Sequence, residues 1–124
     1  YSVLENVLIP TMAFKNRNRA AGERARELLQ RVGLTDRLNH RPAELSGGER
    51  QRVAVARSLI NEPALILADE PSGNLDSESA ENLHQLFFKL RDTYNQTFVI
   101  VTHNEDLATM ADRKLTMVDG KIIS

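Results

Sequence analysis

Two short apolar runs constrain the fold of this chain more than any other feature. One covers residues 64–68 and the other residues 97–102, and neither alternates between apolar and polar side chains. Runs of this kind are typical of strands buried on both faces, as in a parallel sheet. The segment between them carries apolar residues at helical spacing, namely Ala80, Leu83, Phe87 and Leu90. A helix of this length suits the crossover that parallel strands require, so we predict a β-α-β unit.

The first half of the chain has helical periodicity instead. One apolar stripe recurs at the spacing of a helix face and predicts a core helix: Ala21, Ala25, Leu28, Leu29 and Val32. Gly33 is suited to end that helix with a positive φ. Ser46 and Glu49 form a capping-box pattern, so a second helix is expected from Ser46 to about Asn61. We therefore divide the chain into a helical part, 1–61, and an α/β part, 62–124.

The end of the chain adds a short helix and a hairpin. The helix is expected at residues 105–111. Two further apolar segments, 115–118 and 122–123, flank Asp119-Gly120, a strong signal for a two-residue hairpin turn. The predicted order is therefore helices first and then β-α-β-α-β-β, an α/β fold.

Composition excludes several classes of protein. The chain has 124 residues, a net charge of -1 and no cysteine. A disulfide framework and a cysteine-based metal site are therefore excluded. The near-neutral charge gives no reason to expect nucleic acid or an anionic membrane as a partner. No apolar run reaches the roughly 18 residues needed to span a bilayer.

The segment 45–52, with the sequence LSGGERQR, is suited to holding phosphate. A helix N-terminus exposes unsatisfied N–H groups, and Gly47 and Gly48 leave room for an anion to approach them. The Ser46 hydroxyl adds a donor. The alternative is an ordinary N-cap, since capping boxes are common, but the extension 50–57 favours the functional interpretation.

Two carboxylates follow the first apolar run. Asp69 is suited to Mg²⁺, and Glu70 is suited to orient and deprotonate a water molecule. His103 follows the second run and should emerge at the same sheet edge, where it can bind a γ-phosphate. A solvated acidic loop and a helix-capping histidine are the alternatives. His40 and His84 are assigned to a loop and to a helix surface, without function.

No segment fits the phosphate-binding pattern G-x-x-x-x-G-K-S/T. Only Gly120 precedes a lysine, and Leu115 stands five positions before it while Ile122 follows the lysine. The first residue is Tyr1 rather than Met, which we interpret as a cut or processed end.

Together these motifs resemble those of the ATP-binding subunit of ABC transporters. Residues 45–51 resemble the signature motif and 65–69 the Walker B strand, with Glu70 as the adjoining catalytic glutamate. Residues 72–76 resemble the D-loop, and His103 resembles the switch histidine. The stretches 67–76 and 4–7 are similar to the lipoprotein-releasing, macrolide-export and cell-division branch, although Ser72 replaces its usual threonine.

The resemblance implies a P-loop NTPase-like fold, with a helical subdomain followed by part of a mainly parallel sheet with crossover helices. It further implies a head-to-tail homodimer that encloses two ATP molecules. Asp69 would hold Mg²⁺ through water, Glu70 would act as the base and His103 would contact the γ-phosphate. The residues that would reach the partner's ATP or couple the two sites are Ser46, Gly47, Gly48, Glu49 and Asp76.

The implied partners are a second ATP-binding subunit and transmembrane permease subunits, at the cytoplasmic face of the inner membrane and without nucleic acid. A DNA-repair or chromosome-organising ABC ATPase is a weaker alternative, because no heptad run is present. A non-catalytic module that donates its signature motif to a complete partner is the other alternative.

The resemblance also places the phosphate loop before Tyr1, on a strand between residues 98–102 and 115–118. Without that strand two sheet edges lack a partner, so we expect a rearranged sheet or a self-associated dimer.

The isolated 124-residue chain is expected to show no ATPase activity, because the lysine and the loop that grip the triphosphate are not within it. The measurement is phosphate release with Mg²⁺ and ATP. Turnover that the substitution Glu70→Gln abolishes would contradict this expectation.

Overall fold

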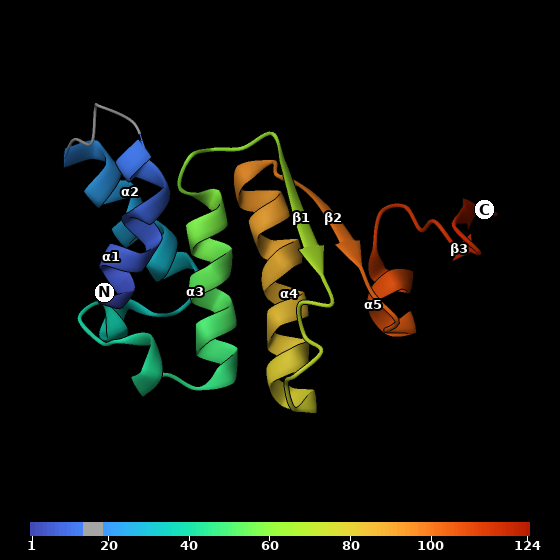
Figure 1. Ribbon diagram of the computed structural model, residues 1–124, viewed down its shortest axis with the longest axis horizontal. Helices are drawn as coiled ribbons and strands as arrows, with labels where there is room; N and C mark the ends of the chain where they lie inside the picture. The colour runs from blue at the N-terminus through green and yellow to red at the C-terminus, as the bar shows by residue number, and fades with distance from the viewer. Residues whose placement is uncertain (14–18) are drawn as a thin grey trace.

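Three helices form the first part of the computed structural model, which describes residues 1–13 and 19–124. They are α1 (Val3–Leu8), α2 (Arg19–Arg31) and α3 (Gly47–Leu59), and they pack against one another at one end of the molecule (Figure 1). Short 3₁₀ turns link them, at Ile9–Ala13, Thr35–Arg37 and Pro42–Glu44. The predicted helical first part is therefore confirmed.

The stripe predicted to face the core is buried. All five of its residues are at most 6% exposed: Ala21, Ala25, Leu28, Leu29 and Val32. Gly33 has a φ of 78°, in the left-handed region that ends a helix without strain only for glycine. The second predicted helix is also present, since Ser46 caps α3 and Ile60 closes it.

A parallel strand pair and one crossover helix form the second part. Strand β1 (Leu65–Asp69) pairs with β2 (Thr97–Val101) so that Leu65 lies opposite Thr97 and Asp69 lies opposite Val101. Helix α4 (Ser77–Tyr94) connects them and lies between α3 and the strands (Figure 1). The Phe87 and Phe98 rings meet edge to face at 5.2 Å. The predicted β-α-β unit is confirmed.

The expectation that both strands are buried on two faces is wrong for the described residues. Leu67 is 74% exposed and Val101 is 59% exposed. Ile66, which points to the opposite face of β1, is 7% exposed. The reason is that α4 covers one face of the pair, while no element within 1–13 and 19–124 covers the other.

The last elements are a short helix and a hairpin. Helix α5 (Glu105–Met110) follows β2, and β3 (Met117–Val118) pairs antiparallel with β4 (Lys121–Ile122). Asp119 and Gly120 both have positive φ, at 50° and 77°, as a two-residue turn of this type requires. The described strands form two separate pairs, so the expected rearrangement of the sheet is not observed, and self-association remains a prediction.

One apolar core joins the two parts. It runs without interruption from α1 through α3 to β1 and α4, and its most buried large side chains include Leu29, Leu34, Ile60, Leu83 and Leu90. The core therefore crosses the division near Asn61, which remains a prediction. None of the helices in the described ranges combines the length and apolarity that crossing a bilayer requires.

The substitution Leu83→Ala is expected to lower the free energy of unfolding by about 2–5 kcal/mol, because it opens a cavity in this core. Leu83 is 2% exposed. The measurement is chemical denaturation of the chain and of each variant. Asn82→Ala is the control, since Asn82 is exposed on the same helix, and it should change stability by less than about 0.5 kcal/mol. Equal effects of both substitutions would contradict the packing described above.

Candidate functional site

Asp69 and Glu70 stand where β1 ends. Asp69 is the last residue of the strand and is exposed. The Glu70 N–H donates to the Val101 carbonyl oxygen at 2.7 Å, which extends the pairing with β2 by one residue. Glu70 has a φ of 45°. A left-handed backbone costs a non-glycine residue about 1 kcal/mol or more, so the surrounding bonds must hold it there.

His103 lies beside Glu70, as the shared sheet edge predicted. Its backbone N–H donates to Glu70 Oε1 at 2.7 Å, and its Nε2 lies 3.7 Å from the same oxygen. The imidazole is 99% exposed and the Glu70 side chain 37% exposed. One carboxylate oxygen thus anchors the start of the segment after β2. The exposed imidazole and the partly exposed carboxylate are both within reach of a ligand.

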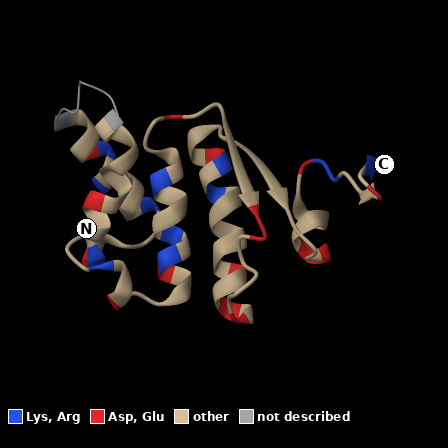
Figure 2. Cartoon of the chain, in the orientation of Figure 1, with Lys and Arg blue, Asp and Glu red and all other residues tan. Residues whose placement is uncertain are grey.

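The carboxylates at this edge fit Mg²⁺ better than a metal that needs a protein cage. Within residues 1–13 and 19–124 there is no group of three or more His, Asp or Glu residues that could hold a metal ion. Mg²⁺ usually keeps several waters and takes only one or two carboxylates. Figure 2 shows acidic residues directly after β1. Asp69 is therefore a fitting protein ligand for a hydrated Mg²⁺.

The capping box predicted at α3 is present. The Glu49 N–H donates to Ser46 Oγ at 3.1 Å, and the Ser46 N–H donates to Glu49 Oε1 at 2.9 Å. The hydrogen bond from the Ser46 backbone lowers the pKa of Glu49 below its ordinary value, and Arg37, 3.3 Å from Glu49 Oε2, contributes to the same effect. Both oxygens of the Glu49 carboxylate thus interact with groups of the same chain, Oε1 with the Ser46 N–H and Oε2 with Arg37. A hydrogen bond from the Ser46 side chain also contributes to the lowered pKa of Glu49.

The two glycines allow a close approach between α3 and the loop before α4. A Cβ atom at Gly47 would lie 3.4 Å from Leu75 Cδ2, and one at Gly48 would lie 3.3 Å from Ser79 Cβ. The glycines therefore serve packing as well as leaving their N–H groups open to an anion. This arrangement at the start of a 13-residue helix fits a phosphate group.

Asp76 caps α4 and stands in the sequence between Leu75 and Ser79, the two residues that the glycines approach. Its Oδ2 accepts a hydrogen bond from the Ser79 N–H at 3.3 Å. Hydrogen bonds from Ser79, first from its side chain and then from its backbone, lower the pKa of Asp76. Ser79 is also the residue that a Cβ atom at Gly48 would approach. One residue therefore serves the cap of α4 and borders residues 45–51, which we call the signature segment.

The predicted site residues thus form two groups. One group, at the sheet edge, consists of Asp69, Glu70 and His103. The other, where α3 and α4 begin, consists of Ser46, Gly47, Gly48, Glu49 and Asp76. The loop 70–76 connects them, since it begins at Glu70 and ends at Asp76.

The assignment of His84 to a helix surface is wrong. His84 is 3% exposed, and its Nε2 lies 2.7 Å from Ser72 Oγ. The sequence contains a signal for this burial, because Ala80, His84 and Phe87 recur at i, i+4 and i+7 on one helix face. The prediction failed because imidazole is polar, although a buried polar group is tolerated once it is hydrogen-bonded. His40 lies in a loop, as predicted.

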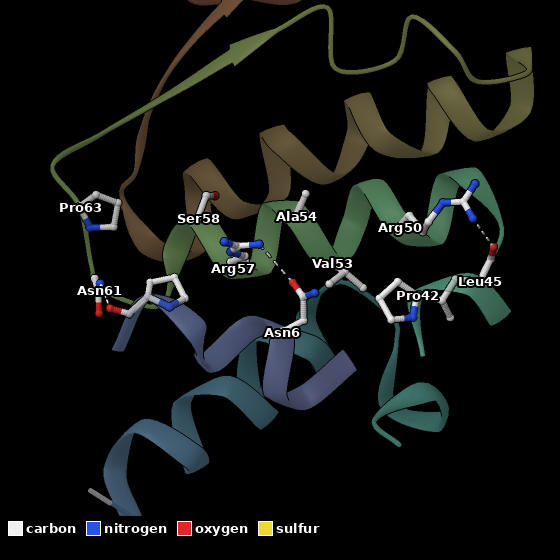
Figure 3. Close-up of a pocket in the computed structure, with 11 residues that line it drawn as sticks. Asn6, Pro42, Leu45, Arg50, Val53, Ala54, Arg57, Ser58, Asn61 and Pro63 are labelled. Atoms are coloured by element: carbon white, nitrogen blue, oxygen red, sulfur yellow. Dashed lines mark hydrogen bonds between the residues drawn. The ribbon is translucent and has the colours of Figure 1, made fainter. Parts of the chain in front are cut away.

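A separate hollow lies between α1 and α3 (Figure 3). Two hydrogen bonds join residues that line it: Arg57 Nη1 donates to Asn6 Oδ1 at 3.5 Å, and Asn61 Nδ2 donates to the Pro10 carbonyl oxygen at 3.2 Å. None of the eight predicted site residues lines it. The hollow is therefore distinct from both groups described above.

Comparisons with known proteins agree with these motifs. A family model described as ABC transporter matches residues 1–73. The lipoprotein-releasing system ATP-binding protein LolD of Cytophaga hutchinsonii is 62% identical over 123 residues. That match covers 99% of this chain and 56% of the relative, so the chain spans little more than half of its length.

Two solved structures show the same fold. The ADP conformation of MJ1267, an ATP-binding cassette of an ABC transporter, has a TM-score of 0.88 at 26% identity, over 99% of this chain and 54% of the other. The dimeric structure of the bacterial ABC transporter cassette MJ0796 has a TM-score of 0.80 at 39% identity, over 98% of this chain and 54% of the other. The predicted α/β fold of the P-loop NTPase type is therefore confirmed.

The contribution of Glu49 to stability should depend on pH. Its pKa is lowered in the folded chain, so its stabilising effect is complete above the ordinary value of 4.5 and is lost as the pH falls through the folded value. The measurement is the free energy of unfolding of the chain and of Glu49→Gln between pH 3 and 7. The difference in the free energy of unfolding between the unmodified chain and Glu49→Gln should be largest near pH 7 and should become smaller below about pH 4.5.

Glu23→Gln is the matched control, because Glu23 is an exposed glutamate near the start of α2. The difference in the free energy of unfolding between Glu23→Gln and the unmodified chain should change less over the same pH range. A difference in the free energy of unfolding for Glu49→Gln that becomes larger as the pH falls would contradict the cap geometry.

Proposed function

Because the chain belongs to the ABC transporter family, we propose that it forms part of the ATP-hydrolysing subunit of an ABC transporter. The observation that carries the proposal is the Glu70–His103 pair at the end of two parallel strands. A carboxylate and an imidazole at one sheet edge are suited to activate water and to bind a phosphate.

The residues have separate roles in this proposal. Glu70 accepts a proton from the attacking water through the oxygen that does not bind the His103 N–H. His103 donates to the terminal phosphate from its exposed imidazole. Asp69 holds Mg²⁺ through water, and the metal neutralises charge on the phosphates when it is bound.

The second group acts on the nucleotide of a partner. Ser46, Gly47 and Gly48 present a hydroxyl and backbone N–H groups from the start of α3. Glu49 orients this helix start through its cap, and Asp76 couples the two sites because it ends the loop that begins at Glu70. The similar MJ0796 cassette was solved as a dimer, which supports a head-to-tail homodimer for this chain.

The transported substrate follows from the relative rather than from the site. Its 62% identity to a lipoprotein-releasing ATP-binding protein supports a role in lipoprotein release. The other partners are then transmembrane permease subunits, and the protein acts peripherally at the cytoplasmic face of the inner membrane.

In the complete subunit, Glu70→Gln is expected to lower ATP turnover by about 10²–10⁴-fold, because it removes the base and keeps the side-chain shape. ATP binding, measured by equilibrium titration, should persist. Asp119→Asn is the control, since it removes a carboxylate from the hairpin turn that asparagine also favours. Turnover by Glu70→Gln equal to that of the unmodified subunit would overturn the assignment of Glu70.

A further inference from the structure

The buried histidine of α4 has no role in the function proposed above. His84 is 3% exposed, although imidazole is a polar group that costs free energy to bury without a partner. Its side chain meets Ser72, with Nε2 at 2.7 Å from Oγ. One of the two groups donates and the other accepts, so each satisfies a hydrogen-bonding group of the other.

Ser72 occupies the middle of the loop 70–76. The Gly73 N–H donates to the Glu70 carbonyl oxygen at 3.1 Å, and the Leu75 N–H donates to the Ser72 carbonyl oxygen at 3.1 Å. These two bonds fold the loop upon itself. The hydroxyl of Ser72 ties the folded loop to α4, two helical turns beyond the cap at Asp76.

Both ends of this loop carry groups of the candidate site. At its start, Glu70 has a left-handed backbone and binds the His103 N–H. Near its end, Leu75 meets the position of Gly47 in the signature segment. A shift of the loop would therefore displace the carboxylate and the signature contact together.

We propose that His84 is a positioning residue that holds the loop 70–76 through Ser72 and so fixes Glu70, which acts on the chain's own nucleotide, relative to the signature segment, which acts on the partner's nucleotide. This inference rests on the proposed function. His84 is too deeply buried to be a ligand for the nucleotide, and it acts only through the serine. Its loss should affect the chemical step more than nucleotide binding, because misplacing a reacting group raises the barrier without removing the binding contacts.

The test compares kcat and KM for ATP in the complete subunit with four changes: His84→Phe, His84→Gln, Ser72→Ala and the double variant of His84→Phe with Ser72→Ala. His84→Phe fills the same space without a hydrogen bond and should lower kcat by about 3–10-fold, with KM changed less than about twofold. Ser72→Ala should lower kcat by a similar factor. The double variant should have a kcat no lower than that of the more impaired single variant. His84→Gln keeps a polar group at the end of the side chain, so its kcat should fall by less than that of His84→Phe.

Leu86→Met is the matched control for a general loss of stability. Leu86 is 8% exposed on the same helix, and methionine nearly conserves its volume. The proposal is overturned when His84→Phe and Ser72→Ala lower kcat no more than Leu86→Met, or when His84→Gln behaves like His84→Phe. Should His84→Phe fail to fold, Ser72→Ala tests the same contact from its other partner.

A second measurement does not depend on hydrolysis. Amide hydrogen exchange of the nucleotide-free subunit should accelerate about 3–10-fold at Gly73 and Leu75 in His84→Phe and in Ser72→Ala, and not in Leu86→Met. Unchanged exchange at both amides overturns the inference. An unmodified subunit that hydrolyses no ATP would overturn the proposed function instead, while the exchange measurement would still decide whether His84 holds the loop.

Discussion

The parallel pairing of β1 with β2 is the constraint on which the rest of the structure depends. Parallel strands end at the same edge, so the residues that follow them meet although more than 30 positions separate them in the chain. The pairing continues one residue past β1, through the Glu70 N–H and the Val101 carbonyl oxygen. That bond helps to hold Glu70 in a backbone conformation that would otherwise be unfavourable. The strand pairing therefore places the backbone of Glu70 at the sheet edge, where the loop 70–76 begins.

The lack of side chains at the two glycines of the signature segment bears both on packing and on the accessibility of backbone N–H groups. A Cβ atom at Gly47 would lie 3.4 Å from Leu75 Cδ2 and one at Gly48 would lie 3.3 Å from Ser79 Cβ, so these neighbours would have to shift by a few tenths of an ångström. The same lack of side chains leaves the first N–H groups of α3 accessible. A substitution there would disturb the packing and, in the function proposed above, the binding of a phosphate, and activity alone could not separate the two effects. The Ser46 cap and the Glu49 carboxylate fix where this helix begins.

Local signals predicted most of the fold. The cap at Ser46, the left-handed Gly33 and the Asp119-Gly120 turn each depend on a few adjacent residues, and all three are present. The proximity of Glu70 and His103 was also predictable, because it follows from strand direction alone. Burial was harder to predict, since it depends on which elements lie above a given face. Leu67 lies on the uncovered face of the sheet and is exposed, whereas His84 lies against the loop 70–76 and is buried.

The candidate site consists of two groups, so the loop 70–76 that connects them must keep them at a fixed distance from each other. In the proposed dimer Glu70 acts on one nucleotide and the glycines of the same chain act on the other. Both sites can therefore form together only when the distance between the two groups is fixed. With only its internal backbone hydrogen bonds, the seven-residue loop would be fixed only at its two ends, and the distance between the two groups could vary. Its turns constrain the chain locally, but neither of the bonds within it reaches α4. The Ser72 hydroxyl supplies that link, and α4 is itself packed into the core through Leu83 and Leu90. The relative position of the two groups therefore rests on α4, a helix that is anchored in the core.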